Sequence, residues 1–136
     1  MHAAISFRPL GRVDSLEPTH VFVIELCGRP VEWIQWYLWS EYPEHALRLG
    51  AELASAGIDF AIGEPAMTGL GLGPFAICEF LRQIVFADPS VSAVITDPEE
   101  GNLSSLRAFR KAGFRGNELG STRRRELQTA SCAHGS

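Results

Sequence analysis

Long apolar runs and an excess of positive charge are both missing from this sequence of 136 residues. No apolar run approaches the roughly 20 residues that a membrane-spanning helix needs, and the first residues lack the basic and then apolar stretches of a secretory signal. Acidic residues outnumber basic ones by 16 to 12, which argues against a general electrostatic attraction to nucleic acid or to an anionic membrane. The sequence therefore predicts neither a membrane protein nor a nucleic-acid-binding one.

Cysteine is scarce as well, and its distribution is typical of free thiols. Cys27, Cys78 and Cys132 are odd in number and far apart, which favours a reducing compartment over a disulfide framework. The four histidines do not pair with them at the spacing of metal ligands. We therefore expect a cytoplasmic protein without a bound metal.

The composition is that of a chain that can build a core. Hydrophobic residues make up 46% and charged residues 21%, values typical of a globular protein and unlike those of disordered or disulfide-scaffold chains. The length suits one domain, which we expect over residues 1–120. A polar, flexible tail is expected over residues 121–136, and the basic run at residues 123–125 is interpreted as part of it.

Short apolar runs broken by glycine and proline set the expected order of elements. Strands are expected at residues 5–10, 20–26, 31–39, 58–62 and 91–96, and helices from residue 74 to about 87 and from residue 102 to about 112. A turn at residues 27–30 would make the second and third strands an antiparallel hairpin. Residues 40–56 show no clear apolar stripe and are read as a loop with one helical turn. This order predicts an α/β fold with helices packed on a mixed sheet.

The most informative segment is a glycine-rich loop at residues 68–74, placed between a strand and the start of a helix. Gly69, Gly71 and Gly73 carry no side chains, so backbone N–H groups can approach an anion closely where the helix dipole also favours negative charge. The spacing matches neither the dinucleotide-binding fingerprint nor the P-loop. A phosphate or pyrophosphate site is one interpretation, and a simple tight turn is the other.

The segments around this loop, taken with it, resemble a known family. They are residues 57–65, 69–73, 86–89 and 96–98, with Asn102, the Ala112-Gly113-Phe114 triplet, and the hairpin residues 28–31 and 34–37. Together they are similar to the GNAT superfamily of N-acetyltransferases, most of all to the aminoglycoside 6′-N-acetyltransferases, with the siderophore-biosynthetic acetyltransferases as relatives. The resemblance implies a mostly antiparallel mixed sheet with flanking helices, and acetyl-coenzyme A as cosubstrate.

The resemblance also implies where acetyl-coenzyme A would lie. Its pantetheine arm would run beside Ile62 and Gly63, and its pyrophosphate would rest on the backbone N–H groups of Leu70, Gly71, Leu72 and Gly73. Asn102 matches an asparagine that touches the pantetheine arm in the family, although an asparagine before a helix is equally explained as an N-cap. Phe109 stands at the position of a tyrosine near the cofactor that protonates the departing thiolate, and phenylalanine has no proton to donate.

Candidate residues for the acceptor follow from the chemistry of amine acetylation. The amine must lose a proton before it attacks a thioester, and a cationic sugar needs carboxylates to hold it. Asp59 and Asp97 stand at matching family positions and are predicted to be catalytic, Asp59 as amine anchor and general base and Asp97 as a second anchor. Asp97 is also explained as a turn residue before proline, and Asp59 as a charge on the solvent side of a strand. Trp36 and Glu41 are further candidates for contact with the acceptor, although Trp36 is also explained as a core residue.

Two parts of the family pattern are hard to find in this chain. Only residues 11–19 separate the first two strands, too few for the two helices that the family places there, and the polar residues 116–136 show weak closing strands. A shortened sheet with exposed edges gives homodimerisation a physical motive. We expect an N-acetyltransferase acting on a small-molecule amine, foremost the 6′-amine of an aminoglycoside antibiotic. The alternatives are a siderophore precursor or another small amine as acceptor, and a catalytically impaired acyl-coenzyme A-binding module.

Overall fold

Seven strands form one sheet, and the structure describes residues 4–11, 19–52, 54–60, 72–96, 103–116 and 122–125. The strands of this computed structural model are β1 (Ile5–Leu10), β2 (Thr19–Leu26), β3 (Arg29–Leu38), β4 (Ala56–Phe60), β5 (Ala93–Thr96), β6 (Arg115–Gly116) and β7 (Thr122–Arg125). Their order is β1-β2-β3-β4-β5-β7-β6, and β4 and β5 are the parallel pair among antiparallel neighbours. The expected mixed, mostly antiparallel sheet is confirmed.

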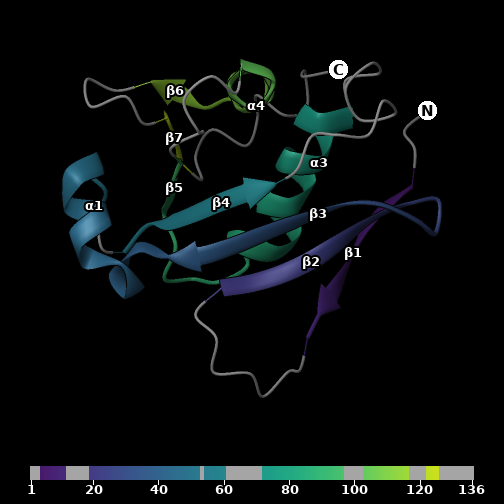
Figure 1. The fold of residues 1–136 in the computed structure, drawn as a ribbon, viewed down its shortest axis with the longest axis horizontal. Helices are drawn as coiled ribbons and strands as arrows, with labels where there is room; N and C mark the ends of the chain where they lie inside the picture. The colour runs from purple at the N-terminus through teal and green to yellow at the C-terminus, as the bar shows by residue number, and fades with distance from the viewer. Residues whose placement is uncertain are drawn as a thin grey trace.

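Helical elements lie on both sides of this sheet. They are the 3₁₀ turn η1 (Trp39–Glu41), α1 (Pro43–Leu49), α3 (Leu72–Phe80), the π-helical turn η2 (Leu81–Val85) and α4 (Leu103–Lys111). In Figure 1, α1 stands apart from α3, beside the end of β3 and the start of β4, while α4 lies at the top of the view, near β6 and the upper end of α3. The flanking helices are therefore confirmed as well.

β2 and β3 form the expected hairpin. Cys27 and Gly28 connect them with φ angles of 51° and 81°, the left-handed values that a tight two-residue hairpin turn requires. The pairing register shifts between Ile24 and Glu25. β3 begins at Arg29, two residues before the expected start, because the turn needs only two residues.

Alternate residues of β3 and β4 face opposite sides of the sheet, since side chains alternate along a strand. Ile34 and Trp36 are buried on one side, in the same cluster as Ile58 of β4. Gln35 lies between them in sequence and is paired in register with Asp59 of β4. The alternation therefore places Trp36 and Asp59 on opposite faces of the sheet.

The main core lies on the Trp36 side, under α3 and α4. The expected apolar face of the helix is confirmed, since Ile77, Phe80 and Leu81 are fully buried and Ile84 is partly buried against them. Burial of each such side chain contributes roughly 1.5–3 kcal/mol to the free energy of unfolding. Gly113, with φ of 98°, ends α4 where the sequence predicts.

The segment read as a loop contains a two-turn helix, and that prediction is wrong in extent. α1 starts with Pro43 in its first turn and ends at Gly50, whose φ is 68°, a usual start and stop for a helix. Ala46 and Leu49 are buried by a second, smaller cluster with Trp39 and with Ile95 of β5. Two buried positions three residues apart make too narrow a stripe for sequence reasoning to detect.

The closing strands are present, which corrects two further expectations. β7 pairs antiparallel with β5, with Ile95 opposite Arg123, and β6 pairs with β7. Residues 122–125 therefore belong to the sheet rather than to a flexible tail. The sequence hid this strand because it is made of threonine and three arginines, and its pairing depends on the neighbouring strand more than on its own propensity.

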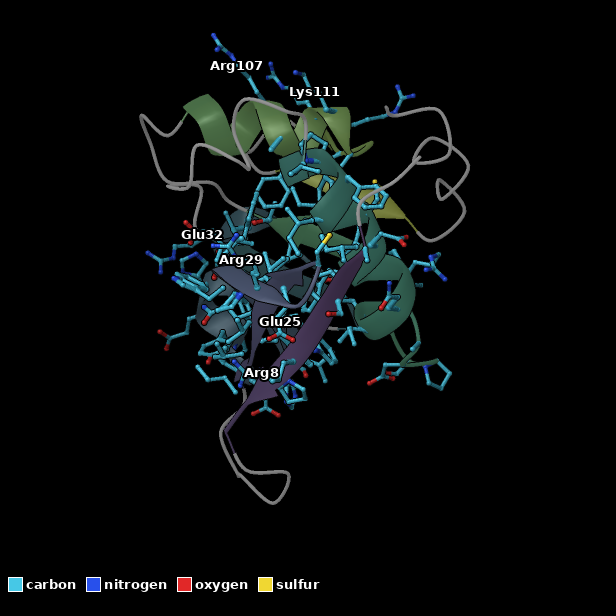
Figure 2. All side chains as sticks on the ribbon, turned by 90° about the vertical axis from the view of Figure 1, so that its right-hand side faces the viewer. Arg8, Glu25, Arg29, Glu32, Arg107 and Lys111 are labelled. Carbon is cyan, nitrogen blue, oxygen red and sulfur yellow. The ribbon has the colours of Figure 1, made fainter. Side chains whose placement is uncertain are left out.

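Charged side chains lie on the outside of these layers. Figure 2 shows Arg107 and Lys111 of α4 pointing away from the sheet. Arg8 of β1 and Glu25 of β2 form an ion pair across the two strands, with 3.4 Å between Nε and Oε2. An exposed pair of this kind contributes at most about 1 kcal/mol to stability.

Other expectations can be compared with the described residues alone. Within the described residues no helix is long and apolar enough to cross a membrane, and no group of three side chains could hold a metal ion. Cys27 is an exposed free thiol, but Cys78 is disulfide-bonded, so the expectation of free thiols is wrong for Cys78 because sequence spacing does not show which cysteines meet in the fold. The two helices judged missing after β1 concern an interval whose residues 12–18 lie outside the described residues.

Candidate functional site

The parallel pair β4 and β5 is joined by few backbone contacts. Within the described residues their register consists of one pair, Ala56 with Val94. Two residues further along each strand, the buried Thr96 donates a hydrogen bond from Oγ1 to the carbonyl oxygen of Ile58, at 2.8 Å. A side chain thus bridges the two strands two residues beyond the register pair, where a continued ladder would use backbone groups.

α3 begins just after the glycine-rich loop, and its N-terminus is suited to bind an anion. Leu72 and Gly73 form its first turn with Pro74, and no acidic side chain stands in that turn. The N–H groups of a first helical turn have no partners within the helix, and the helix dipole favours negative charge beside them. The first turn of α3 therefore suits a phosphate group.

Of the remaining predicted cofactor residues, five are not described by the structure and one, Phe109, is buried. Ile62, Gly63, Leu70, Gly71 and Asn102 lie outside the described residues. Phe109 of α4 is 2% exposed, with its ring edge-on to those of Phe60 and Phe114 at centroid distances of 5.7 and 5.0 Å. Its side chain belongs to the main core, and its contact with a cofactor stays a prediction.

A pocket of about 250 Å³ opens on the face of the sheet opposite to the main core. Its walls come from β2, β3, β4, η1 and α1, and the lining residues are Thr19, Gln35, Tyr37, Trp39, Tyr42, His45 and Asp59. We call it the Asp59 pocket. One predicted catalytic residue, Asp59, is therefore in a pocket, and three aromatic side chains surround it with an imidazole.

Asp59 is held in place by its strand neighbour. Gln35 Nε2 donates a hydrogen bond to Asp59 Oδ2 at 3.2 Å, and the two residues are directly opposite in the register of β3 and β4. The side chain is half-buried. A carboxylate at this position gains a fixed orientation from the amide while its exposed edge can accept further hydrogen bonds from a cation.

The aromatic wall of the Asp59 pocket is packed ring against ring. The indole of Trp39 is 3% exposed and donates from Nε1 to the carbonyl oxygen of Ile95 at 2.9 Å. Tyr37 stands edge-on to Trp39 and to Tyr42, with centroid distances of 5.1 and 5.4 Å. Aromatic faces beside a carboxylate attract cations, typically by 0.5–2 kcal/mol each.

Sequence reasoning missed Tyr42 and His45, because the segment that carries them was read as a loop. His45 is stacked on Trp39, with 5.4 Å between ring centroids and 16° between ring planes. The signals that could have found it are Pro43 at the helix start and Gly50 at its end. A helix begun there places His45 beside the end of β3.

A second pocket, of about 380 Å³, adjoins the first. Tyr42 and His45 line both pockets, and the second is completed by Pro43, Glu44 and Arg48 of α1. The two pockets thus share a boundary made by Tyr42 and His45, and one ligand could extend from Asp59 toward Glu44.

Of the other predicted acceptor residues, the two that the structure describes, Trp36 and Glu41, are not brought to Asp59. Trp36 is 8% exposed within the main core, on the opposite face of the sheet. Glu41 is exposed in η1 and is not among the residues that line the Asp59 pocket. Asp97 lies outside the described residues, so its proximity to Asp59 stays a prediction.

Comparison with known proteins gives a family match over most of the chain. Residues 8–121 match the family described as the acetyltransferase (GNAT) domain. The aminoglycoside N(6′)-acetyltransferases type 1 of Klebsiella pneumoniae and Serratia marcescens are each 30% identical over 113 residues, which cover 77% of this chain and 52% of the relative. The kanamycin resistance protein of Rhizobium radiobacter is 38% identical over 58 residues, 43% of this chain and 53% of that protein. The chain spans about half the length of the curated relatives it matches.

Solved structures share the fold. The aminoglycoside acetyltransferase AAC(6′)-Ib in complex with coenzyme A superposes with a TM-score of 0.63 at 24% identity, over 84% of this chain and 70% of that one. An uncharacterized protein from Bacillus halodurans superposes with a TM-score of 0.72 at 18% identity, over 88% of this chain and 65% of that one. The arrangement of strands and helices described above is therefore shared with known structures.

Proposed function

Because the chain belongs to the GNAT acetyltransferase family, we propose that it transfers the acetyl group of acetyl-coenzyme A to a primary amine. The 6′-amine of an aminoglycoside is the proposed acceptor, since the relatives at 30% identity are named for that reaction. The match covers about half the length of these relatives. The proposal therefore depends on the residues of this chain.

The observation that carries the proposal is the weak junction between β4 and β5. Within the part of the chain that the structure describes, their register has the single pair Ala56 and Val94, and Thr96 bridges to Ile58 by its side chain. β4 leads into the glycine-rich loop, and that loop leads into the first turn of α3. We propose that the strands separate beyond this bridge, so that an extended cosubstrate with a charged end lies between them with its pyrophosphate beside that turn.

The first turn of α3 fits the negative charge of acetyl-coenzyme A. Leu72 and Gly73 offer backbone N–H groups without an acidic neighbour in the first turn, as a pyrophosphate requires. The bound cosubstrate would supply an activated thioester. Backbone N–H groups of the β4 strand end would polarise its carbonyl oxygen, since such donors stabilise a developing oxyanion.

Asp59 is proposed to hold the acceptor amine. Its carboxylate faces a pocket with aromatic walls, and Gln35 fixes its orientation. A carboxylate and aromatic faces together favour a cationic group over a neutral one. Phe109 offers no proton to the departing thiolate, and coenzyme A can leave as the thiolate. Release of the product thus requires no general acid at this position.

Two measurements in sequence test the proposal. Calorimetric titration with acetyl-coenzyme A is expected to show binding, and a thiol-release assay over a panel of amines is expected to show turnover, highest with kanamycin. Higher turnover with a hydroxylated alkyl diamine would favour a siderophore precursor as acceptor. Binding without turnover would favour an acyl-coenzyme A-binding module, and absence of binding would contradict the proposal outright.

A further inference from the structure

The two histidines within the described residues, His20 and His45, rest on tryptophan rings on opposite faces of the sheet. His45 is stacked on Trp39 at 5.4 Å, with 16° between the ring planes. His20 is tilted over Trp36 at 4.9 Å, with 33° between the planes. His45 lines the pocket that contains Asp59, whereas Trp36, under His20, is part of the core on the other face.

The imidazole of His45 is held by a ring that cannot easily move. Trp39 is buried and anchored by its hydrogen bond to the carbonyl oxygen of Ile95, and Tyr37 is packed edge-on against it. His45 itself is exposed on α1. Its ring plane is therefore set by Trp39, while its outer edge is open to water.

We propose that His45 accepts the proton that the acceptor ammonium must lose before it attacks, while Asp59 holds that ammonium in the same pocket. This inference rests on the proposed acetyl transfer. A ring nitrogen of neutral His45 takes a proton from the ammonium, which becomes a neutral amine. The amine nitrogen forms a bond to the thioester carbonyl carbon, the carbon–sulfur bond breaks, and the second amine proton leaves with the thiolate as the coenzyme A thiol.

The exposure of His45 allows its ring to return to the neutral form after each turnover. The imidazolium formed in the first step gives its proton to water at its open edge, which restores the neutral ring. Histidine is the side chain whose ordinary titration range lies near neutral pH, and a base works best when its pKa is near the operating pH. A carboxylate such as that of Asp59 is better suited to holding the cation.

Charged and titratable groups line both of the pockets that His45 borders. Glu44 and Arg48 stand on its own helix and line the adjoining pocket with it. Asp59 of β4 and the phenols of Tyr37 and Tyr42 line the Asp59 pocket with it. The charged side chains that share these pockets with His45 are thus two carboxylates and one guanidinium, and His45 brings the imidazole that can accept a proton.

The test is the pH dependence of kcat/KM for the intact protein with kanamycin and acetyl-coenzyme A. With His45 as base, kcat/KM is expected to rise at acid pH and then reach a plateau, because the protonated amine is the form that binds. In His45→Asn and His45→Gln, kcat/KM at pH 7 is expected to fall about 10²-fold. It should then rise tenfold per pH unit without a plateau, because only amine that is already neutral can react.

Two controls separate a proton acceptor from a structural residue. His20→Asn removes the other tryptophan-stacked imidazole and is expected to keep the wild-type profile. Added imidazole is expected to restore part of the activity of His45→Asn and none of that of Asp59→Asn, because a small base can replace a missing imidazole in an open pocket. A merely structural loss would not respond to imidazole.

The outcomes that overturn the inference differ from those that overturn the proposed function. A wild-type profile that rises tenfold per pH unit without a plateau would rule out a base on the protein, without recourse to any variant. A plateau that persists in both His45 variants would also overturn it, and in each of these cases acetyl transfer itself would stand. Failure of the wild-type protein to acetylate any amine would contradict the transfer and the role of His45 together.

Discussion

Asp59 shows how the alternation of a strand places a carboxylate in a pocket. Its neighbours Ile58 and Phe60 are buried in the main core, so the alternation of the strand directs Asp59 to the other face, where Gln35 meets it. The sequence predicts the importance of Asp59 because a carboxylate between two apolar residues is unusual in a strand. The partner Gln35 could not be predicted, because the register of β3 against β4 is set by the fold.

Asp59→Asn is expected to lower kcat/KM for the amine by at least about 10²-fold and to leave the affinity for acetyl-coenzyme A unchanged. The neutral amide keeps the shape of the side chain but no longer attracts an ammonium group. Steady-state kinetics and calorimetric titration measure the two quantities separately.

Glu25→Gln is the matched control for this variant. Glu25 is also a strand carboxylate with a side-chain partner, Arg8, but it lies on β2 away from the Asp59 pocket. It is expected to keep wild-type turnover. Equal loss of activity in both variants, or none in Asp59→Asn, would remove Asp59 from the site.

Gly57→Ala is expected to lower the free energy of unfolding by about 1–3 kcal/mol, the usual cost of overpacking. A methyl group on Gly57 would overlap the ring of Tyr37, which lies directly opposite in the register. Because Tyr37 lines the Asp59 pocket, kcat/KM is expected to fall as well. Chemical denaturation and kinetics measure the two effects.

Gly116→Ala serves as its comparison, because a methyl group there would meet nothing within 4 Å. It is expected to match the wild-type protein in stability and turnover. If Gly57→Ala were as stable and active as Gly116→Ala, Tyr37 would not have the fixed position that we describe.

At the scale of elements, α1 packs against the sheet through Trp39, which also lines the Asp59 pocket. Trp39→Phe removes the donor to the carbonyl oxygen of Ile95, and a buried acceptor left without its partner costs about 1–3 kcal/mol. We expect a lower Tm together with lower kcat/KM, since His45 loses the ring on which it stacks. Thermal denaturation and kinetics provide the readouts.

Trp33→Phe controls for the loss of an indole as such. Trp33 is on β3, 42% exposed, and is not among the residues that line the Asp59 pocket. We expect it to change Tm and turnover little. A similar loss in Trp33→Phe would show that the Trp39 result reflects the sheet rather than the junction with α1.

The turn after η2 makes the stability of the fold depend on pH, independently of the pocket. Asp88 accepts hydrogen bonds from the Oγ and backbone N of Ser90, at 2.7 and 2.9 Å, and these bonds lower the pKa of the Asp88 carboxyl below its ordinary value. A carboxyl with a lowered folded-state pKa stabilises the fold above its unfolded-state pKa, and that stabilisation is lost as pH falls through the folded-state pKa.

Ser90→Ala is expected to raise the pKa of Asp88 and to weaken the loss of stability in acid, because the stronger of the two hydrogen bonds is removed. An NMR titration of the Asp88 carboxyl, compared with the wild-type protein, measures the shift. An unchanged titration would mean that Ser90 does not hold this carboxylate.

For the whole molecule, the sequence predicts the hairpin and the main core well. It predicts less well the closing edge of the sheet and the helix beside the pocket. The hairpin and the apolar face of α3 follow from local pattern, since Ile77 and Phe80 recur at helical spacing and are buried. β7 and α1 could not be predicted, because Arg123 pairs with Ile95 only in the folded sheet and α1 buries little more than Ala46 and Leu49.

The same limit applies to the candidate site. Asp59 and the glycine-rich turn before α3 can be picked out from the sequence, because each depends on local chemistry at a recognisable place. Tyr42 and His45 reach Asp59 only through the packing of α1 against Trp39 and Ile95. The cosubstrate side is thus predicted by local pattern, whereas the acceptor side depends on contacts between distant segments.

The central claim is that this chain acetylates a primary amine with acetyl-coenzyme A. The most direct measurement is mass spectrometry of kanamycin incubated with the protein and acetyl-coenzyme A, with thiol release followed in the same reaction. We predict one acetyl group on the 6′-amine for each coenzyme A thiol released, and loss of both signals in Asp59→Asn. Thiol release without an acetylated amine, or neither signal with any amine of the panel, would contradict the account.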